Sequence, residues 1–470
     1  MSLIIPANSA AAGGGFNATN SLMFNRADSA YLVHTNSGTG SYQRSTFSAW
    51  VKRSSLGTVQ TMWNNQVQAG VNQVRFEFDA ADKIYLYGEE AGGYALRALT
   101  TSVYRDLSAW YHVLVIIDTP QSAAADRIKL YVNGVQVTLT FSTTPAQNAN
   151  LRINYDNTPV SVGSTQASNY LDGYMAEVYW IDGTVYATSD FGEFDEDSGI
   201  WKPIDASGLT FGTNGFYLDF EDSSALGNDA AGSNNFSATN IAATDQGIDT
   251  CTNNFATLNP LVQGTSNNAR TFSDGNTTVV LGRDSASVSS IGVSSGKWYV
   301  EIKCVTDAAN PVIGIAKEGS PATVNPWGGS NLVGTNEYGY VSDGKKKGNA
   351  GSFASYGATW TSGNTISMAY DADTGTLWFA KDGAWQASAT KTEIENGTTT
   401  NSAFTGLSGL FFFGCCDAAT PTGDKFSCNF GSPYYAITSG NTDGDGFGNF
   451  EYEVPSGYFA LCTKNLAEYG

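Results

Sequence analysis

Apolar and polar residues alternate in runs along the chain, and the alternation is clearest between residues 296 and 385. Three of these runs are GKWYVEIK at 296–303, VIGIA at 312–316 and ISMAYD at 366–371. A period of two places the apolar side chains of a strand on one face, so each run predicts a strand with one face buried. Gly, Asp and Asn separate the runs and predict tight turns between them.

The last of these runs continues as a predicted hairpin. Its turn is expected at 371–375, and a second tight turn follows at 381–383. The ordered segments GKWYVEIK, VIGIA, YGYVSDGKK at 338–346 and this hairpin resemble the SPRY family over residues 266–433. The resemblance implies an antiparallel β-sandwich that binds partners through loops at one edge.

The same alternation recurs in the first part of the chain. It predicts strands in TFSAWVKR at 46–53, WYHVLVIID at 110–118, IKLYVNGVQV at 128–137 and YLDGYMAEVYWIDGTVY at 170–186. Their spacing favours a sandwich or barrel over a parallel α/β sheet. These ordered segments resemble the LamG-like branch of the concanavalin A-like lectins and glucanases. That resemblance implies a jelly-roll sandwich, often with carbohydrate or protein ligands and sometimes with a calcium ion at its rim.

We therefore expect an all-β protein made of two antiparallel jelly-roll (concanavalin A-like) β-sandwiches joined by an aromatic-anchored connector. The predicted parts are a flexible N-terminal arm at 1–20, a LamG-like sandwich at 21–186, a connector at 187–262, a SPRY-like sandwich at 263–433 and a tail that folds back at 434–470. The connector holds aromatic residues such as Trp201 and Tyr217, so we expect it to pack on the sandwiches. The arm is either a frayed terminus or a docking segment.

Composition excludes several classes of function. The 470 residues contain 44 Asp and Glu against 24 Lys and Arg, which gives a formal net charge of −20. A surface this acidic repels phosphate backbones, so no nucleic acid is expected as a partner. No run approaches the ~20 apolar residues of a membrane span. The first residues lack the basic region and apolar core of a signal peptide, so we expect no membrane insertion and assembly in a cytoplasm.

Paired carboxylates are the candidates for catalysis, because the concanavalin A-like fold also carries glycosidases. Many retaining β-glucanases of this fold use E-x-D-x-x-E on one strand, which brings nucleophile and acid/base to one sugar. Residues 77–82 and 193–198 come closest, but they have Asp and Ser where the acid/base belongs. Solvated carboxylates explain both stretches. His112 alternates with core residues and is expected to be a packed, hydrogen-bonded imidazole. We therefore expect no catalytic residues and no enzyme.

One acidic motif indicates a metal. The spacing Asn441-x-Asp443-x-Asp445-Gly446 matches the first half of a calcium loop, in which alternate side chains converge on one cation. The twelfth position is Tyr452 rather than the bidentate Glu of the full loop. An ordinary acidic turn is the alternative, and calcium is the one cofactor that the sequence suggests.

Candidate ligand-binding residues lie in the SPRY-like region. Aromatic side chains in loops stack on sugar rings or anchor protein partners. The selected residues are Trp327, Tyr338, Lys345, Tyr356 and Trp360. Trp327, in a Pro-Trp-Gly-Gly turn, is the one that we most expect to be exposed. Packing inside the domain is the alternative for most of the others.

The whole chain has a further resemblance, carried by four segments. They are SLIIPANSA at 2–10, LDGYMAEVYWIDGT at 171–184, DFGEFDEDSGIWKPID at 190–205 and PSGYFALCTKNL at 455–466. Their order, with the two sandwiches, resembles virion-associated proteins of tail-fibre or appendage type in marine tailed bacteriophages. That resemblance implies a structural or receptor-binding role in the particle and names no catalytic residue.

The expected function is therefore that of a phage virion protein, assembled in the host cytoplasm. The main hypothesis is a tail-fibre or spike adhesion component that binds host-surface glycan or protein through sandwich loops. A capsid-surface fibre or decoration protein and a virion-associated glycan hydrolase are the alternatives. The N-terminal arm would contact other virion proteins. A homo-oligomer is expected, and a trimer is favoured by analogy with tail fibres alone.

Overall fold

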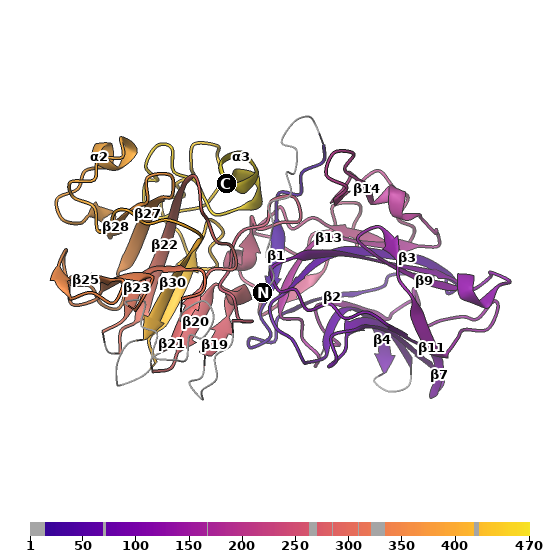
Figure 1. The fold of residues 1–470 in the computed structure, drawn as a ribbon. Helices are drawn as coiled ribbons and strands as arrows, with labels where there is room; N and C mark the ends of the chain where they lie inside the picture. Colours follow the sequence, from indigo (N-terminus) through magenta and orange to yellow (C-terminus); the bar gives the residue numbers. More distant parts are fainter. Residues whose placement is uncertain are drawn as a thin grey trace. The chain divides into compact units, whose positions relative to one another are not determined.

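The computed structural model describes residues 15–68, 72–166, 168–262, 270–283, 285–308, 310–320, 334–417 and 423–470. These residues form two compact units, one within Ala12–Thr252 and one within Asn253–Gly470. Strands dominate both units (Figure 1). Each unit is described by itself below.

The first unit packs two antiparallel sheets face to face, visible as two layers in Figure 1. Sheet A has the order β10 (Val135–Gln136), β9 (Ile128–Val132), β8 (Trp110–Asp118), β3 (Arg44–Arg53), β13 (Gly173–Asp182), β1 (Ser21–Phe24) and β18 (Gln246–Gly247), with β16 (Phe216–Leu218) paired to β13. Sheet B has the order β11 (Leu139–Thr143), β7 (Gly93–Thr100), β6 (Ile84–Glu90), β5 (Asn72–Phe78), β4 (Gln60–Gln68), β12 (Pro159–Val162), β2 (Tyr31–Thr35) and β17 (Ser237–Thr239).

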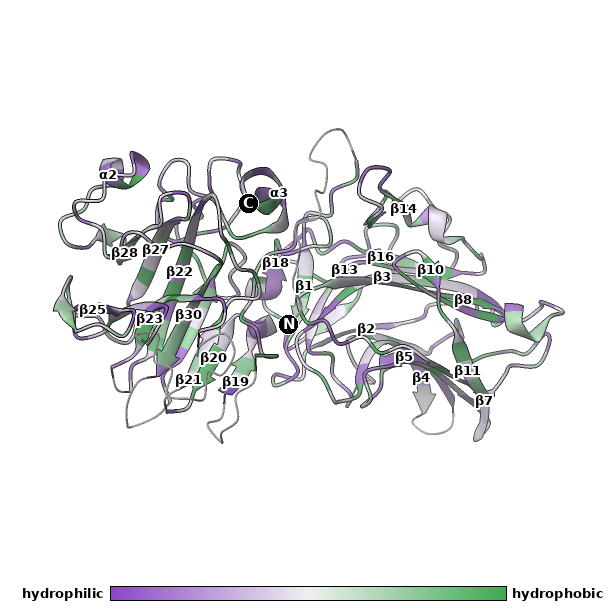
Figure 2. Cartoon of the chain, viewed as in Figure 1, coloured by the Kyte–Doolittle hydropathy of each residue, from purple (hydrophilic) through white to green (hydrophobic). Residues whose placement is uncertain are grey.

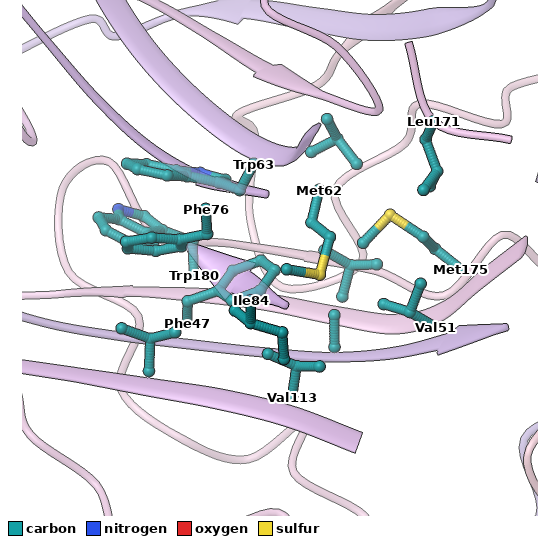
Figure 3. Close-up of a cluster of buried hydrophobic side chains, with 14 of the residues drawn as sticks. Phe47, Val51, Met62, Trp63, Phe76, Ile84, Val113, Leu171, Met175 and Trp180 are labelled. Atoms are coloured by element: carbon teal, nitrogen blue, oxygen red, sulfur yellow. The ribbon is translucent and has the colours of Figure 1, made fainter. Parts of the chain in front are cut away.

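The core of the first unit lies between these sheets. Trp63 of sheet B stacks on Trp180 of sheet A with ring centroids 4.1 Å apart, and Phe76 lies beside them (Figure 3). Met62 and Met175 belong to the same buried cluster. Burying a large apolar side chain stabilises a fold by about 1.5–3 kcal/mol, so these contacts between the layers hold the sandwich closed.

The stretch predicted as a connector divides between the two units. Residues 187–252 belong to the first unit and build β14 (Gly192–Phe194) and β15 (Trp201–Pro203), which form a hairpin, together with β16, β17 and β18. A second apolar cluster joins Leu114 and Ile181 of sheet A to Phe191 and Tyr217 of this stretch, so it covers the outer face of sheet A. Residues 253–262 belong to the second unit.

The second unit is also a sandwich of two antiparallel sheets. The seven-stranded sheet has the order β19 (Arg270–Ser273), β20 (Thr278–Leu281), β31 (Lys425–Asn429), β22 (Lys297–Thr306), β27 (Thr365–Asp371), β28 (Thr376–Lys381) and β29 (Ala384–Trp385). The six-stranded sheet has the order β21 (Ser285–Val288), β30 (Phe411–Asp417), β23 (Val312–Lys317), β24 (Glu337–Val341), β25 (Lys345–Gly348) and β26 (Ala354–Ser355).

Alternation along the strands sets the core of the second unit, and Figure 2 shows hydrophobic and hydrophilic bands following one another along β22. Trp298, Val300 and Ile302 of β22 face the core and are fully buried. The predicted hairpin is confirmed, because β27 and β28 pair antiparallel with Asp371 opposite Thr376.

The tail at 434–470 lies on the outer face of the seven-stranded sheet. Glu301 points to that face from β22 and accepts hydrogen bonds from the backbone N–H groups of Glu451 (3.0 Å) and Tyr452 (2.8 Å). Phe450 packs edge-on against the Tyr299 ring with centroids 5.1 Å apart. A parallel bridge from Trp298 to Phe459 adds a backbone connection, so the tail is an integral part of this unit.

Helices are short among the described residues. They are α2 (Lys391–Glu395), α3 (Thr463–Tyr469) and the 3₁₀ turns η1 (Ala124–Asp126), η2 (Thr188–Asp190), η3 (Ala243–Asp245) and η4 (Asp274–Asn276). No helix in this part of the chain is long and apolar enough to cross a membrane. The architecture is all-β, with two antiparallel sandwiches in sequence, as the alternation predicts.

Candidate functional site

The ligand-binding residues predicted in the SPRY-like region lie at one margin of the six-stranded sheet. Tyr338 is on β24 and Lys345 is on β25, while Tyr356 and Trp360 follow β26. Trp327 lies outside the described residues. The fold therefore brings the four described residues into one region of the second unit.

Two of these four are core residues, which corrects the prediction that they bind ligand. Tyr356 is 9% exposed and Trp360 is 2% exposed, and their ring centroids lie 5.4 and 6.2 Å from that of Tyr340. Beyond β26 the chain turns back across the sheet, because the N–H of Tyr356 bonds to the carbonyl of Gly344 and that of Trp360 to Ser342. That return places both rings in the core.

The other two remain at the surface of this margin. Tyr338 is half-buried, and the exposed Lys345 forms an ion pair with Asp343 at 2.6 Å. The exposed aromatic side chain here is Phe353, 53% exposed, with the ammonium of Lys347 lying 4.6 Å from its ring centroid. Sequence reasoning missed Phe353, although a lone aromatic residue in a segment of Asn, Gly and Ser is the signal that could have found it.

The acidic motif in the tail is a hydrogen-bonded turn. Asp443 is 6% exposed, and its Oδ1 accepts from the backbone N–H groups of Asp445 (3.0 Å) and Phe447 (2.9 Å). Its Oδ2 accepts from the N–H of Ala460 (2.9 Å) and from Nδ2 of Asn465 (2.8 Å). The carboxylate thus connects the turn to α3.

This arrangement does not fit the predicted calcium loop. A calcium ligand must present oxygen lone pairs to the cation, and four N–H donors occupy those of Asp443. Asn441 uses its amide to donate to the carbonyls of Phe450 and Glu451. In the parts of the chain that the structure describes, no group of three or more His, Cys, Asp or Glu could hold a metal ion.

The carboxylates of the first glucanase-like stretch have separate partners. Glu77, 2% exposed on β5, pairs with Arg75 at 3.0 Å, and burial raises its pKa. Asp79 accepts from the backbone N–H of Lys83 at 2.9 Å and shapes the turn after β5. Asp82 pairs with Arg105 at 2.8 Å. The spacing therefore places one carboxylate on the sheet and two in its turn.

The second glucanase-like stretch forms the β14–β15 hairpin. Asp195 accepts from the N–H of Ser198 at 2.9 Å and from its hydroxyl at 2.8 Å, and these bonds lower the pKa of Asp195 to about 2. Glu193 pairs with Lys202 at 3.3 Å on the exposed side of the hairpin. The acidic side chains here shape a surface turn.

His112 is a packed imidazole, which confirms the expectation for it. Its Nδ1 accepts from the indole N–H of Trp201 at 3.1 Å, so its Nε2 carries the proton that bonds to Ser48 Oγ at 2.8 Å. Burial lowers the pKa of His112 to about 3, which keeps the ring neutral. The imidazole anchors the β14–β15 hairpin through Trp201.

Sequence reasoning also missed an aromatic and charged surface on the outer face of sheet B. Tyr85, Tyr87, Tyr94 and Arg97 lie together there on β6 and β7, near the margin formed by β7 and β11 (Figure 1). The alternation in IYLYG at 84–88 indicates the outward tyrosines, but not which of the two sheets carries them.

Comparison with known proteins gives two family matches. Residues 25–188 match the laminin G-type family model of the concanavalin A-like lectin/glucanases superfamily. Residues 297–432 match the SPRY domain model. The comparison with curated proteins finds no match.

Several solved structures match parts of this chain. The SPRY domain of human HERC1 is 16% identical, and the match covers 32% of this chain and 87% of that one with a TM-score of 0.25. A putative carbohydrate binding protein from Bacteroides ovatus is 16% identical over 48% of this chain and 59% of that one, with a TM-score of 0.33. Domains LG4-5 of the mouse laminin alpha1 chain are 10% identical over 89% and 88%, with a TM-score of 0.31. The chain thus carries a LamG-like, concanavalin A-like sandwich followed by a SPRY sandwich.

Proposed function

We propose that this protein is a component of a bacteriophage particle that binds the host surface, as part of a tail fibre or spike. The order of segments along the chain carries the proposal. A LamG-like sandwich, the segment at 190–205, a SPRY-like sandwich and the segment at 455–466 follow one another along the chain. This order resembles that of virion-associated proteins of marine tailed phages.

The segments at 190–205 and 455–466 are both packed into the fold, which supports a role for them as fixed parts of the protein. The segment at 190–205 holds the β14–β15 hairpin, and Trp201 fastens it to His112. The segment at 455–466 supplies Phe459, which bridges to β22, and Ala460, which donates to Asp443. Sandwich scaffolds whose segments are joined by such contacts suit a protein that holds a ligand on its surface.

The proposed partners are a host-surface glycan or protein and other virion proteins. Residues 1–20 are the proposed contact with the particle, and 1–14 of them lie outside the described residues. A homo-oligomer, with a trimer favoured, would present several copies of a weak binding site at once. Linking such sites raises the overall avidity by about 10²–10⁴ when they engage together.

Two measurements test this proposal. Antibody against the purified protein, applied to intact particles and viewed by electron microscopy, should mark the tail. Label on the head would instead favour the capsid-surface alternative. Purified protein added at saturating dose should block adsorption of the phage to its host, and unchanged adsorption would count against the adhesion role.

A further inference from the structure

The outer face of sheet B carries its own aromatic platform. Ile84 and Leu86 of β6 are fully buried in the core. Because successive side chains of a strand point to opposite faces, Tyr85 and Tyr87 point to the outer face of sheet B. On β7 the same alternation turns Arg97 outward, opposite Tyr87 in the strand register. A register shift between Gly88 and Glu89 places Tyr94 opposite Glu89, so Tyr94 joins Arg97 on the same face although the two are three residues apart.

Close contacts fix the side chains of this platform. The rings of Tyr85 and Tyr87 meet edge to face at 5.6 Å, and those of Tyr87 and Tyr94 do so at 5.9 Å. The guanidinium of Arg97 lies 4.5 Å from the centroid of the Tyr94 ring, and its Nε donates to the hydroxyl of Tyr85 at 2.8 Å. Such fixed side chains lose little conformational freedom when a ligand binds.

Tyr94 is the exposed member of the platform. It is 54% exposed, whereas Tyr87 is 9% exposed. Because Arg97 covers part of the Tyr94 ring, the rest of this ring is a flat apolar surface that is held in place and open to solvent. The C–H groups of a pyranose ring form a matching flat apolar surface, while the ring hydroxyls need polar partners.

The charges around Tyr94 balance one another. Arg75 pairs with Glu77 at 3.0 Å, and Glu89 accepts from Gln73 at 2.7 Å beside Tyr94. Among the described residues beside Tyr94, Arg75 and Arg97 thus stand against Glu77 and Glu89, in a chain whose net charge is −20. A balanced face of this kind favours a neutral ligand over a phosphorylated or carboxylated one.

Arg97 has hydrogen-bond donors available for such a ligand. Among the described residues its close partners are Tyr85 and Tyr94, and neither accepts from its two Nη groups. An arginine carries five N–H donors in a fixed plane. Hydroxyl oxygens of a sugar lying on Tyr94 would lie within reach of these donors.

We propose that Tyr94 and Arg97, on the outer face of sheet B, bind a neutral, pyranose-containing glycan. The sugar ring stacks on Tyr94, and its hydroxyls accept hydrogen bonds from Arg97. This deepens the proposed function, on which it rests, by naming the ligand class and by placing its site on the LamG-like sandwich. It differs from the loop residues predicted on the SPRY-like one.

The test uses the full chain on a printed array of neutral oligosaccharides built from glucose, galactose or mannose, with sialylated and uronic acid-containing oligosaccharides beside them. The wild type should bind at least one neutral oligosaccharide. Tyr94→Ala should weaken that binding by about tenfold or more, which corresponds to about 1.4 kcal/mol or more, since the stacking contact with the sugar ring is lost. Tyr94→Phe should retain it within about threefold, because stacking needs only the ring. Arg97→Gln should weaken it by about tenfold.

Phe194→Ala is the matched control, because Phe194 is 50% exposed and lies on the β14–β15 hairpin. It should bind like the wild type. The proposal is overturned if no neutral oligosaccharide is retained above background, if binding is confined to the acidic ones, or if Tyr94→Ala binds like the wild type.

The adsorption assay separates this inference from the proposed function. If the protein blocks phage adsorption and Tyr94→Ala blocks equally well, adhesion stands and this site is wrong. If neutral glycan is bound through Tyr94 but adsorption is unaffected at saturating dose, the site stands and the adhesion role fails.

Discussion

At the scale of single residues, Glu177 makes the stability of the first unit depend on pH. Its carboxylate is 3% exposed and accepts from the hydroxyls of Tyr179 (2.6 Å) and Tyr217 (2.8 Å). Burial raises the pKa of Glu177 from 4.5 to about 7. The folded state therefore binds more protons than the unfolded state between these values, and stability falls as pH rises through that window.

Glu177→Gln should remove this loss, on the order of 3 kcal/mol, because glutamine keeps the acceptor and does not ionise. Thermal unfolding at about pH 5 and about pH 7.5 tests this prediction. The melting temperature of the variant, taken relative to that of the wild type, should be higher at about pH 7.5 than at about pH 5. Burial also raises the pKa of Glu301 to about 7, so the comparison must be between variant and wild type at each pH. An equal shift at both pH values would contradict the prediction.

Asp443 gives a second prediction at this scale. Asp443→Ala leaves four N–H donors without their acceptor, so we expect the second unit to lose about 2–4 kcal/mol in chemical denaturation. Asp445→Ala, at an exposed position of the same turn, should change stability by less than about 0.5 kcal/mol. Calcium should leave the wild-type Tm unchanged. A rise in Tm with calcium and not with magnesium would restore the calcium loop.

The packing role of a side chain in a strand could be predicted better than the solvent exposure of an aromatic residue in a loop or beside a turn. His112 is expected to be packed and hydrogen-bonded, and it is fully buried against Trp201 on the covered outer face of sheet A. Tyr356 and Tyr94 are both tyrosines close to Gly and Ala in the sequence, yet one is 9% and the other 54% exposed. The difference arises because the chain beyond β26 folds back over Tyr340, a tertiary contact that carries no local signal. The aromatic residues that face solvent could therefore be identified only from the structure.

At the scale of elements, the β14–β15 hairpin depends on one side chain. Trp201 is 8% exposed, bonds to His112, and lies so close to Gly134 that a Cβ there would be 2.3 Å from its ring. Trp201→Ala should destabilise the first unit by about 3–5 kcal/mol, and Trp201→Phe should cost less because it keeps part of the packing. Hydrogen exchange of Gly192–Phe194 should accelerate in the alanine variant. Unchanged exchange would show that the hairpin is held by other contacts.

The long strands built from apolar runs were the predictable ones. The strand predicted at 110–118 coincides with β8, and the hairpin before Lys381 has its predicted turn. β16 is only three residues long and is buried on both faces, with Phe216 and Leu218 in the core between the sheets and Tyr217 under the cover of sheet A. Its pairing with β13 joins residues about forty positions apart, for example Val178 with Leu218. Pairing at that range depends on tertiary packing, which alternation does not encode.

At the scale of the whole molecule, two sandwiches in sequence were predictable and the division between them was not. The family resemblances rest on ordered strand segments, and both regions match family models. The stretch at 187–262 has many turn residues, and this composition predicts a connector. The structure instead assigns the stretch to the first unit as far as residue 252. Its short strands gain their stability from the sheets that they join, and turn-rich composition does not reveal such partners.

This division predicts which fragments fold. A fragment of residues 15–186 lacks β16, β17 and β18, and with them Phe216, Leu218 and Phe220, each at most 2% exposed. Losing three such side chains removes about 5–9 kcal/mol, which is comparable to the whole stability of a typical domain. We expect 15–252 to unfold cooperatively in circular dichroism and 15–186 to show no cooperative transition. If 15–186 melted at the same temperature as 15–252, residues 187–252 would be a dispensable cover, and the boundary predicted at 186 would describe the folding unit better than the one at 252.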